Sequence, residues 1–295
     1  MNGRQVLLYF SWSAPAEAAA PLTVIDDRFP AIFELRRLFY PTYESLADPG
    51  RVDQGIDGFL EHVQRRNFAA FAEQAEAHTG RAAIQVERVA RGGSVTPLDA
   101  ELLAGVDTVV VISFDSLRTA QAASRSEIDA VERFLAVPDH LIAICPHHDI
   151  GETSATTAQA RAARQLAEHL HHGDKVIPPR QGFGGFARSL LAGLGVAVQN
   201  QFGLRPASEP DGSPAPIEVD ESLDRLRLLE GVSTFNAHPH LPHFERAEAS
   251  LKRLEVLARQ RIDLTAPSHP FTQNGRTTFD ALLQSMRTPS PQPCS

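Results

Sequence analysis

Short apolar runs alternate with amphipathic stretches along the first half of the chain. Residues 5–12 and 107–114 are almost continuously apolar and rich in β-branched or aromatic side chains, which predicts strands buried on both faces of a sheet. Residues 84–90 alternate between apolar and polar positions, as a half-exposed strand does, and residues 141–145 form a further apolar strand.

The stretches between these strands show helical spacing. From residue 56 to residue 78 apolar positions recur every three to five residues, and Gly80 stops the pattern. Ser124 and Glu127 form a capping box that predicts the start of another helix, and a short helix is expected over residues 97–106. Alternating strands and helices predict an α/β fold with a doubly wound, mostly parallel sheet and helices on both faces.

The second half of the chain has weaker patterns. The expected elements are helices at 157–171, 186–194 and 279–286, a strand at 231–235, and a helix passing into a strand over 247–259. We expect a single domain with insertions over residues 1–270, followed by a short helix and a flexible tail over 271–295.

Composition and charge narrow the function classes. The chain has 28 Lys and Arg against 36 Asp and Glu, a net charge of −8, which argues against a nucleic-acid-binding protein. No apolar run approaches the ~18 residues of a membrane span, and two cysteines make no disulfide framework. The apolar run after Arg4 is short for a signal peptide and is better explained as a strand. We expect a cytoplasmic protein with a small-molecule substrate, and homo-oligomer formation is left open.

Cys145 ends the predicted strand 141–145. Ligands of parallel α/β sheets bind at the carboxyl ends of the strands, and a thiol there can act as a nucleophile if its pKa is lowered. The alternative is that Cys145 is a small buried side chain that finishes a strand.

The turn after Cys145 is His147-His148-Asp149. Adjacent residues of an extended chain point in opposite directions, so only one of the two histidines can readily face Cys145. His147 is the candidate catalytic group of the pair, and His148 and Asp149 are candidate substrate-binding residues. Asp149 also suits a cap of the turn or of the next helix.

A second cluster of polar residues lies about ninety positions later. His238 and His240 have the two-residue spacing that places side chains on one side of an extended chain, and Asn236 is a candidate substrate-binding residue beside them. One imidazole can serve as a base. Alternatively, His147, His148, His238 and His240 can hold Zn²⁺, or the run contains solvated turn histidines. The glycine-rich residues 182–185 can present amides to an anion but lack a full nucleotide-binding fingerprint.

The segments 107–112, 126–135 and 141–145 together resemble the class I glutamine amidotransferase-like superfamily, including its intracellular-protease-like and trehalose-utilisation-type branches. The match covers mainly residues 84–151. The resemblance implies a flavodoxin-like sheet, Cys145 at a nucleophile elbow, and His238 or His240 as the base. Ala143 and His147 stand where a typical elbow has glycines.

The leading expectation is a small-molecule hydrolase or hydratase that acts on a carbon–nitrogen bond. Cys145 would be the nucleophile, a histidine would be the base, and no cofactor would be needed. Two alternatives stay open, namely a Zn²⁺-dependent hydrolase that uses the histidine cluster and a noncatalytic ligand-binding member of the superfamily.

Overall fold

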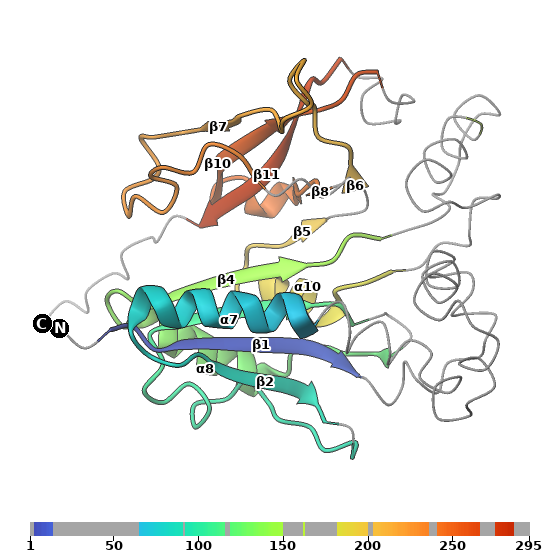
Figure 1. The fold of residues 1–295 in the computed structure, drawn as a ribbon. Helices are drawn as coiled ribbons and strands as arrows, with labels where there is room; N and C mark the ends of the chain where they lie inside the picture. Colours follow the sequence, from blue (N-terminus) through green and yellow to red (C-terminus); the bar gives the residue numbers. More distant parts are fainter. Residues whose placement is uncertain are drawn as a thin grey trace, which may run out of the picture.

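The computed structural model combines a parallel sheet flanked by helices with an antiparallel sheet formed by the later part of the chain (Figure 1). The residues it describes are 3–13, 65–90, 92–115, 119–149, 162, 182–199, 203–235, 241–265 and 275–285.

The parallel sheet has four strands in the order β2-β1-β3-β4. Its strands are β1 (Val6–Ser13), β2 (Ile84–Val89), β3 (Thr108–Ser113) and β4 (Leu141–Pro146). All neighbouring pairs are parallel. The four strand predictions of the first half are confirmed. The continuous apolar runs of β1 and β3 lie in the centre of the sheet, and β2 and β4 lie at its edges.

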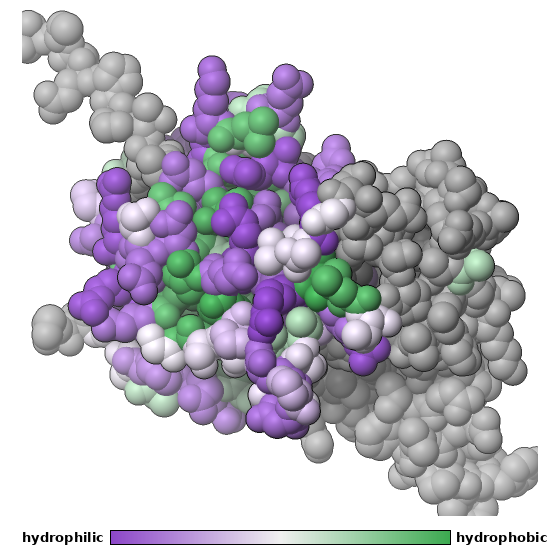
Figure 2. Space-filling model, turned by 90° about the horizontal axis from the view of Figure 1, so that it is seen from above, coloured by the Kyte–Doolittle hydropathy of each residue, from purple (hydrophilic) through white to green (hydrophobic). Residues whose placement is uncertain are grey.

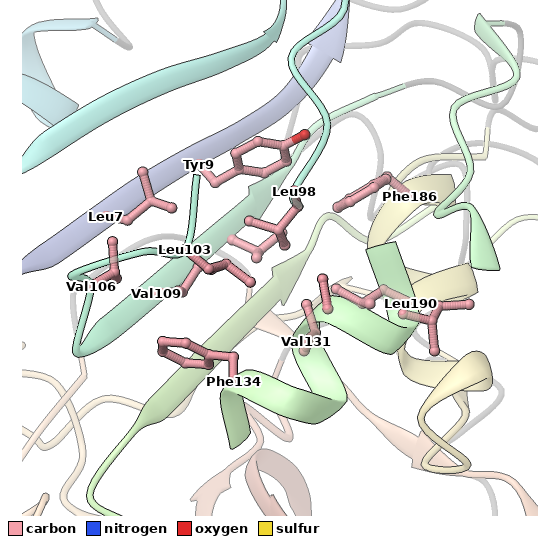
Figure 3. Packing of buried hydrophobic residues seen from close by; sticks show 13 residues of the cluster. Leu7, Tyr9, Leu98, Leu103, Val106, Val109, Val131, Phe134, Phe186 and Leu190 are labelled. Atoms are coloured by element: carbon pink, nitrogen blue, oxygen red, sulfur yellow. The ribbon is translucent and has the colours of Figure 1, made fainter. Parts of the chain in front are cut away.

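Helices contact both faces of this sheet. Alternate residues of β1 point to opposite sides, so Leu7 and Tyr9 join one buried cluster while Val6 and Leu8 join another. The first cluster includes residues of α8 (Arg125–Ala136) and α10 (Gly185–Gly193), and Figure 3 shows this packing. The second includes Ala72 of α7 (Arg65–Thr79). The predicted α/β class and mostly parallel sheet are confirmed.

Helix α8 begins as the sequence predicts. The Ser124 hydroxyl accepts a hydrogen bond from the Glu127 amide, and the Glu127 side chain accepts one from the Ser124 amide. Residues 97–106, by contrast, form turns rather than the expected helix. The Asp99 carboxylate accepts hydrogen bonds from the amides of Glu101 and Leu102, and Gly105 has a φ of 74°, so the backbone turns without propagating a helix.

The later part of the chain forms an antiparallel sheet in the order β11-β10-β7. Its strands are β7 (Ile217–Val219), β10 (Leu254–Arg261) and β11 (Thr278–Ser285). Two short pairings join β5 (Val198–Gln199) to β9 (Glu245–Arg246) and β6 (Gly203–Leu204) to β8 (Leu241–Pro242). Seen from above, the described surface is a mixture of hydrophilic and hydrophobic residues (Figure 2).

Three predictions fall in this part of the chain. The helix expected over 279–286 is wrong: these residues lie mostly in β11, which pairs with β10 along its length. The strand expected over 231–235 is also wrong, although the Ser233 carbonyl accepts a hydrogen bond from Ile217 of β7. The helix-to-strand transition is confirmed as the short 3-10 helix η3 (Glu248–Ser250) followed by β10.

Other expectations fall largely outside the description. The predicted helix 157–171 is described only at Ala162, which is helical, and the tail beyond residue 285 lies outside the described residues. Within the described parts of the chain, no helix has both the length and the apolar character needed to cross a lipid bilayer.

Candidate functional site at the carboxyl end of the parallel sheet

The carboxyl ends of parallel strands meet at one edge of their sheet, and polar residues gather there. Ser11 lies near the end of β1, Ser113 ends β3 and Asp115 follows it, and residues 147–149 follow β4. The beginning of α10 lies at the same edge, because its first amides bond to groups at the end of β3. This is the edge at which open α/β sheets bind ligands.

Asp115 is the centre of this polar network. Its carboxylate is fully buried and accepts hydrogen bonds from the Ser11 hydroxyl at 2.9 Å, the Ser113 hydroxyl at 2.5 Å and the Phe186 amide at 2.9 Å. Burial raises the pKa of the Asp115 carboxyl above its ordinary value, and these hydrogen bonds oppose the rise without cancelling it. The carboxylate therefore caps α10 from a different element of the fold.

This capping decides the role of the glycine-rich residues 182–185. The Gly184 amide donates to the Asp115 carbonyl, and the Ala187 amide donates to the Ser113 hydroxyl. Together with the Phe186 amide, these donors at the start of α10 already have acceptors within the protein. The Gly184 amide of the glycine-rich residues 182–185 therefore helps to join α10 to β3.

Gly184 is required by this junction. Its φ is 68°, in the left-handed region that side chains with a Cβ avoid. A Cβ at this position would lie 3.0 Å from the Cβ of Pro146 and 3.3 Å from the backbone of His147. The absence of a side chain lets the start of α10 approach the end of β4.

Cys145 lies inside β4, opposite Ile112 of β3. The strand continues through Pro146, and the His147 amide still donates to the Ser113 carbonyl at 2.9 Å. The backbone therefore does not make the sharp turn of a nucleophile elbow at Cys145. The residue as a whole is exposed, but protein around the sulfur desolvates it and raises the pKa of the thiol.

His147 is the described histidine on the same side of the strand as Cys145, because the two are separated by one residue of extended chain. Its ring lies 5.1 Å from that of Phe114, 4.9 Å from that of Phe183 and 4.5 Å from that of His148, between centroids. Its Nδ1 lies 2.7 Å from the His148 carbonyl oxygen. A carbonyl only accepts, so Nδ1 carries the proton and Nε2 is the basic nitrogen.

His148 and Asp149 are buried and hold the turn in place. The Nδ1 of His148 donates to the carbonyl of Asp149 at 2.7 Å. The Asp149 carboxylate accepts from the Phe183 amide at 3.1 Å and from the Arg188 guanidinium at 2.5 Å. Asp149 thus connects the end of β4 to α10, which is close to its predicted capping role.

The other candidate residues, Asn236, His238 and His240, lie outside the described residues, so their meeting with Cys145 stays a prediction. Just beyond them, His243 is buried, and its Nδ1 accepts a hydrogen bond from the Asp280 amide at 3.0 Å. Burial, together with Arg276, lowers the pKa of His243 to about 4, although Asp280 opposes this. His243 is therefore neutral near pH 7 and joins this segment to β11.

A metal site finds no support in the described residues, which contain no group of three or more His, Cys, Asp or Glu side chains arranged to hold an ion. Of the four proposed zinc ligands, only His147 and His148 are described. The Nδ1 atoms of both rings bond to backbone carbonyls. The zinc alternative therefore depends on His238 and His240.

A buried ion pair near this edge was not anticipated. Arg88 of β2 pairs with Glu127 of α8, donates to the Tyr9 hydroxyl at 2.9 Å and lies 4.4 Å from the ring centre of Phe186. Burial opposes ionisation of Glu127, but hydrogen bonds led by that from Arg88 give a net lowering of its pKa, whereas burial raises the pKa of Tyr9 to about 12. In the sequence, only the capping box indicated a structural role for Glu127. The alternating pattern of residues 84–90 gave no indication that Arg88 would be buried in an ion pair.

Asp115 and Arg188 were also missed. Asp115 could have been found, because it directly follows the strongest predicted strand, at the end where ligands bind. Arg188 had no comparable signal within its helix.

Comparison with protein-family models, with curated proteins and with solved structures gives no match.

Proposed function

We propose that the protein is a small-molecule hydrolase or hydratase that acts on a carbon–nitrogen bond at the carboxyl end of the parallel sheet. Cys145 would be the nucleophile and a histidine the general base. The observation that carries the proposal is the exposed residue Cys145 one residue before the end of β4, with His147 on the same side of the extended chain.

The raised pKa of the thiol constrains the mechanism. Cys145 is protonated near pH 7, so it is not a thiolate before substrate binds. It needs a base that removes its proton as the bond to substrate forms. In amide hydrolysis, the sulfur bonds to the carbonyl carbon while His147 Nε2 accepts the thiol proton. That proton then passes to the leaving amine, and water hydrolyses the thioester and restores the thiol. His238 and His240 are the alternative bases.

The test is turnover of a panel of small amides and nitriles. Cys145→Ala should abolish turnover, and His147→Asn should lower kcat by about 10²–10⁴-fold, the usual contribution of a general base. Cys294→Ala is the matched control and should leave turnover unchanged. Full activity of Cys145→Ala would remove the nucleophile from the proposal.

A noncatalytic ligand-binding protein is the second candidate. It is favoured by the raised thiol pKa and by the regular backbone at Cys145, since neither activates a nucleophile. In that case no panel member would be turned over, and iodoacetamide would modify Cys145 only slowly at pH 7. Ligands would still raise the Tm of wild type and Cys145→Ala equally.

The metal-dependent alternative has a separate test. Activity that falls on treatment with a chelator and returns with added Zn²⁺, together with loss of bound zinc in His238→Ala and His240→Ala, would replace the cysteine mechanism. Activity in protein shown by elemental analysis to contain no stoichiometric metal would exclude this alternative.

A further inference from the structure

Arg188 of α10 has a hydrogen-bonding capacity that the described residues do not use. A guanidinium carries five N–H donors in one plane. The Nη2 group of Arg188 donates to Asp149, but its Nε is buried and has no hydrogen-bond partner among the described residues. A buried, charged donor without an acceptor is unfavourable, because it has lost its water and gained nothing in exchange.

Asp149 does not provide the missing acceptor. The same Oδ1 atom accepts from both Arg188 and the amide of Phe183, which holds the carboxylate against the loop that precedes α10. The Asp149 side chain is 4% exposed and that of Arg188 is 22% exposed, so the pair lies at the boundary between the interior and the surface. The Nε itself has almost no accessible surface, so a bound molecule reaches it only when the groups that cover it move aside.

The position of this donor points to a ligand. Asp149 follows β4 at the carboxyl end of the sheet, where ligands of parallel α/β folds bind. The rings of buried Phe183 and half-buried His147 lie at the same turn, with their centroids 4.9 Å apart. Aromatic rings beside a single oriented donor are a common combination in small-molecule recognition.

The charges determine which acceptor fits. Asp149 already balances the charge of Arg188, and the carboxyl of Asp115 is buried beyond the Phe186 amide at the same helix start. An anion would meet an arginine that is already paired, whereas a neutral carbonyl oxygen would satisfy the donor without adding negative charge.

We infer that the Nε–H of Arg188 binds the carbonyl oxygen of an uncharged amide. As a statement about substrate class, this rests on the proposed function, and it favours amide hydrolysis over hydration of a nitrile, whose nitrogen is a weaker hydrogen-bond acceptor than an amide oxygen. The binding site itself does not depend on catalysis by Cys145.

The experiment observes the ¹⁵N-labelled Arg188 Nε–H signal directly by NMR, with the signal assigned through its loss in Arg188→Lys. The full chain is titrated with acetamide, and acetonitrile and sodium acetate serve as matched probes. The expected result is a saturable shift of the Arg188 signal with acetamide and no saturable shift with acetonitrile or acetate. A saturable shift with acetate alone, or none with acetamide, would overturn the inference.

Arg188→Lys also provides the binding control. It retains a cation beside Asp149 but lacks the Nε–H, so acetamide binding followed at the Phe183 amide should weaken at least tenfold. Unchanged affinity would overturn the inference.

Cys145→Ala separates the two proposals. It should bind acetamide as wild type does. Equal binding combined with absence of amide turnover in wild type would leave the inference standing and remove the proposed function.

Discussion

A buried polar network at the parallel sheet and a buried amide in the antiparallel sheet differ in their hydrogen bonding. At the parallel sheet, Arg88, Glu127 and Asp115 each have several hydrogen-bond partners. In the antiparallel sheet, Gln260 of β10 is fully buried, and neither atom of its amide has a partner in the described parts of the chain.

This difference shows that a buried polar residue can have either of two effects on the fold. A network with partners on three elements orients those elements and is lost as a unit. An amide without partners only lowers stability, unless a bound molecule satisfies it. Burial alone therefore does not distinguish the structural polar residues of this protein from the unsatisfied ones. Variants in each sheet test this distinction.

The largest effect is expected for Glu127→Ala. This change leaves Arg88 buried without its carboxylate, and it removes the acceptor of the Leu98 and Ser124 amides. We expect a loss of about 3–5 kcal/mol in the free energy of unfolding, measured with urea. Glu132→Ala, at an exposed position of the same helix, should stay within about 0.5 kcal/mol. A loss below about 1 kcal/mol for Glu127→Ala would show that the network does not act as a unit.

The second effect concerns pH and the antiparallel sheet. The pKa of His243 is about 4 in the folded chain and 6.5 ordinarily, so the unfolded chain binds the proton first as pH falls. The contribution of His243 is therefore fully present above pH 6.5 and decreases between 6.5 and 4, by up to about 3 kcal/mol at about 1.4 kcal/mol per pKa unit.

His243→Asn removes this titration and retains an acceptor for the Asp280 amide. The variant should have a flatter dependence of unfolding free energy on pH between 6.5 and 4. The exposed His78, replaced in the same way, should leave the pH dependence as in wild type. An unchanged slope in His243→Asn would mean that this buried histidine does not titrate differently on unfolding.

Gly184→Ala tests the contact between α10 and β4. A Cβ at Gly184 adds a 3.0 Å contact with Pro146 to the strain of a φ of 68°. Gly80 has a φ of 70° but open space around it, so Gly80→Ala isolates the backbone effect of about 1–2 kcal/mol. We expect Gly184→Ala to lose more in thermal unfolding than Gly80→Ala. Equal losses would show that the junction adjusts.

The smallest effect is expected for Gln260→Leu. Replacing an unsatisfied amide with an apolar side chain of similar size should raise the free energy of unfolding by about 1 kcal/mol. Gln85→Leu, at an exposed position of β2, should change it by less than about 0.5 kcal/mol. A clear destabilisation by Gln260→Leu would reveal a partner for the amide.

Local sequence determined the parallel sheet and the start of α8. Strands β1, β3 and β4 are short apolar runs bounded by polar or turn residues, which favours strands, and the Ser124–Glu127 capping box acts within four residues. Cys145 was correctly expected near the end of β4 for the same reason. Such signals are local, so they do not depend on what the rest of the chain does.

Only the tertiary structure decided the rest. Residues 278–285 form a strand because β10 pairs with them, although their short apolar pattern also suits a helix. The pairing of Arg88 with Glu127, and of Arg188 with Asp149, joins residues 39 positions apart in each case. Asp115 accepts a hydrogen bond from the amide of Phe186, 71 residues later, and so caps α10. These contacts connect side chains that no local pattern relates, because the energy that selects them arises only when the elements pack together.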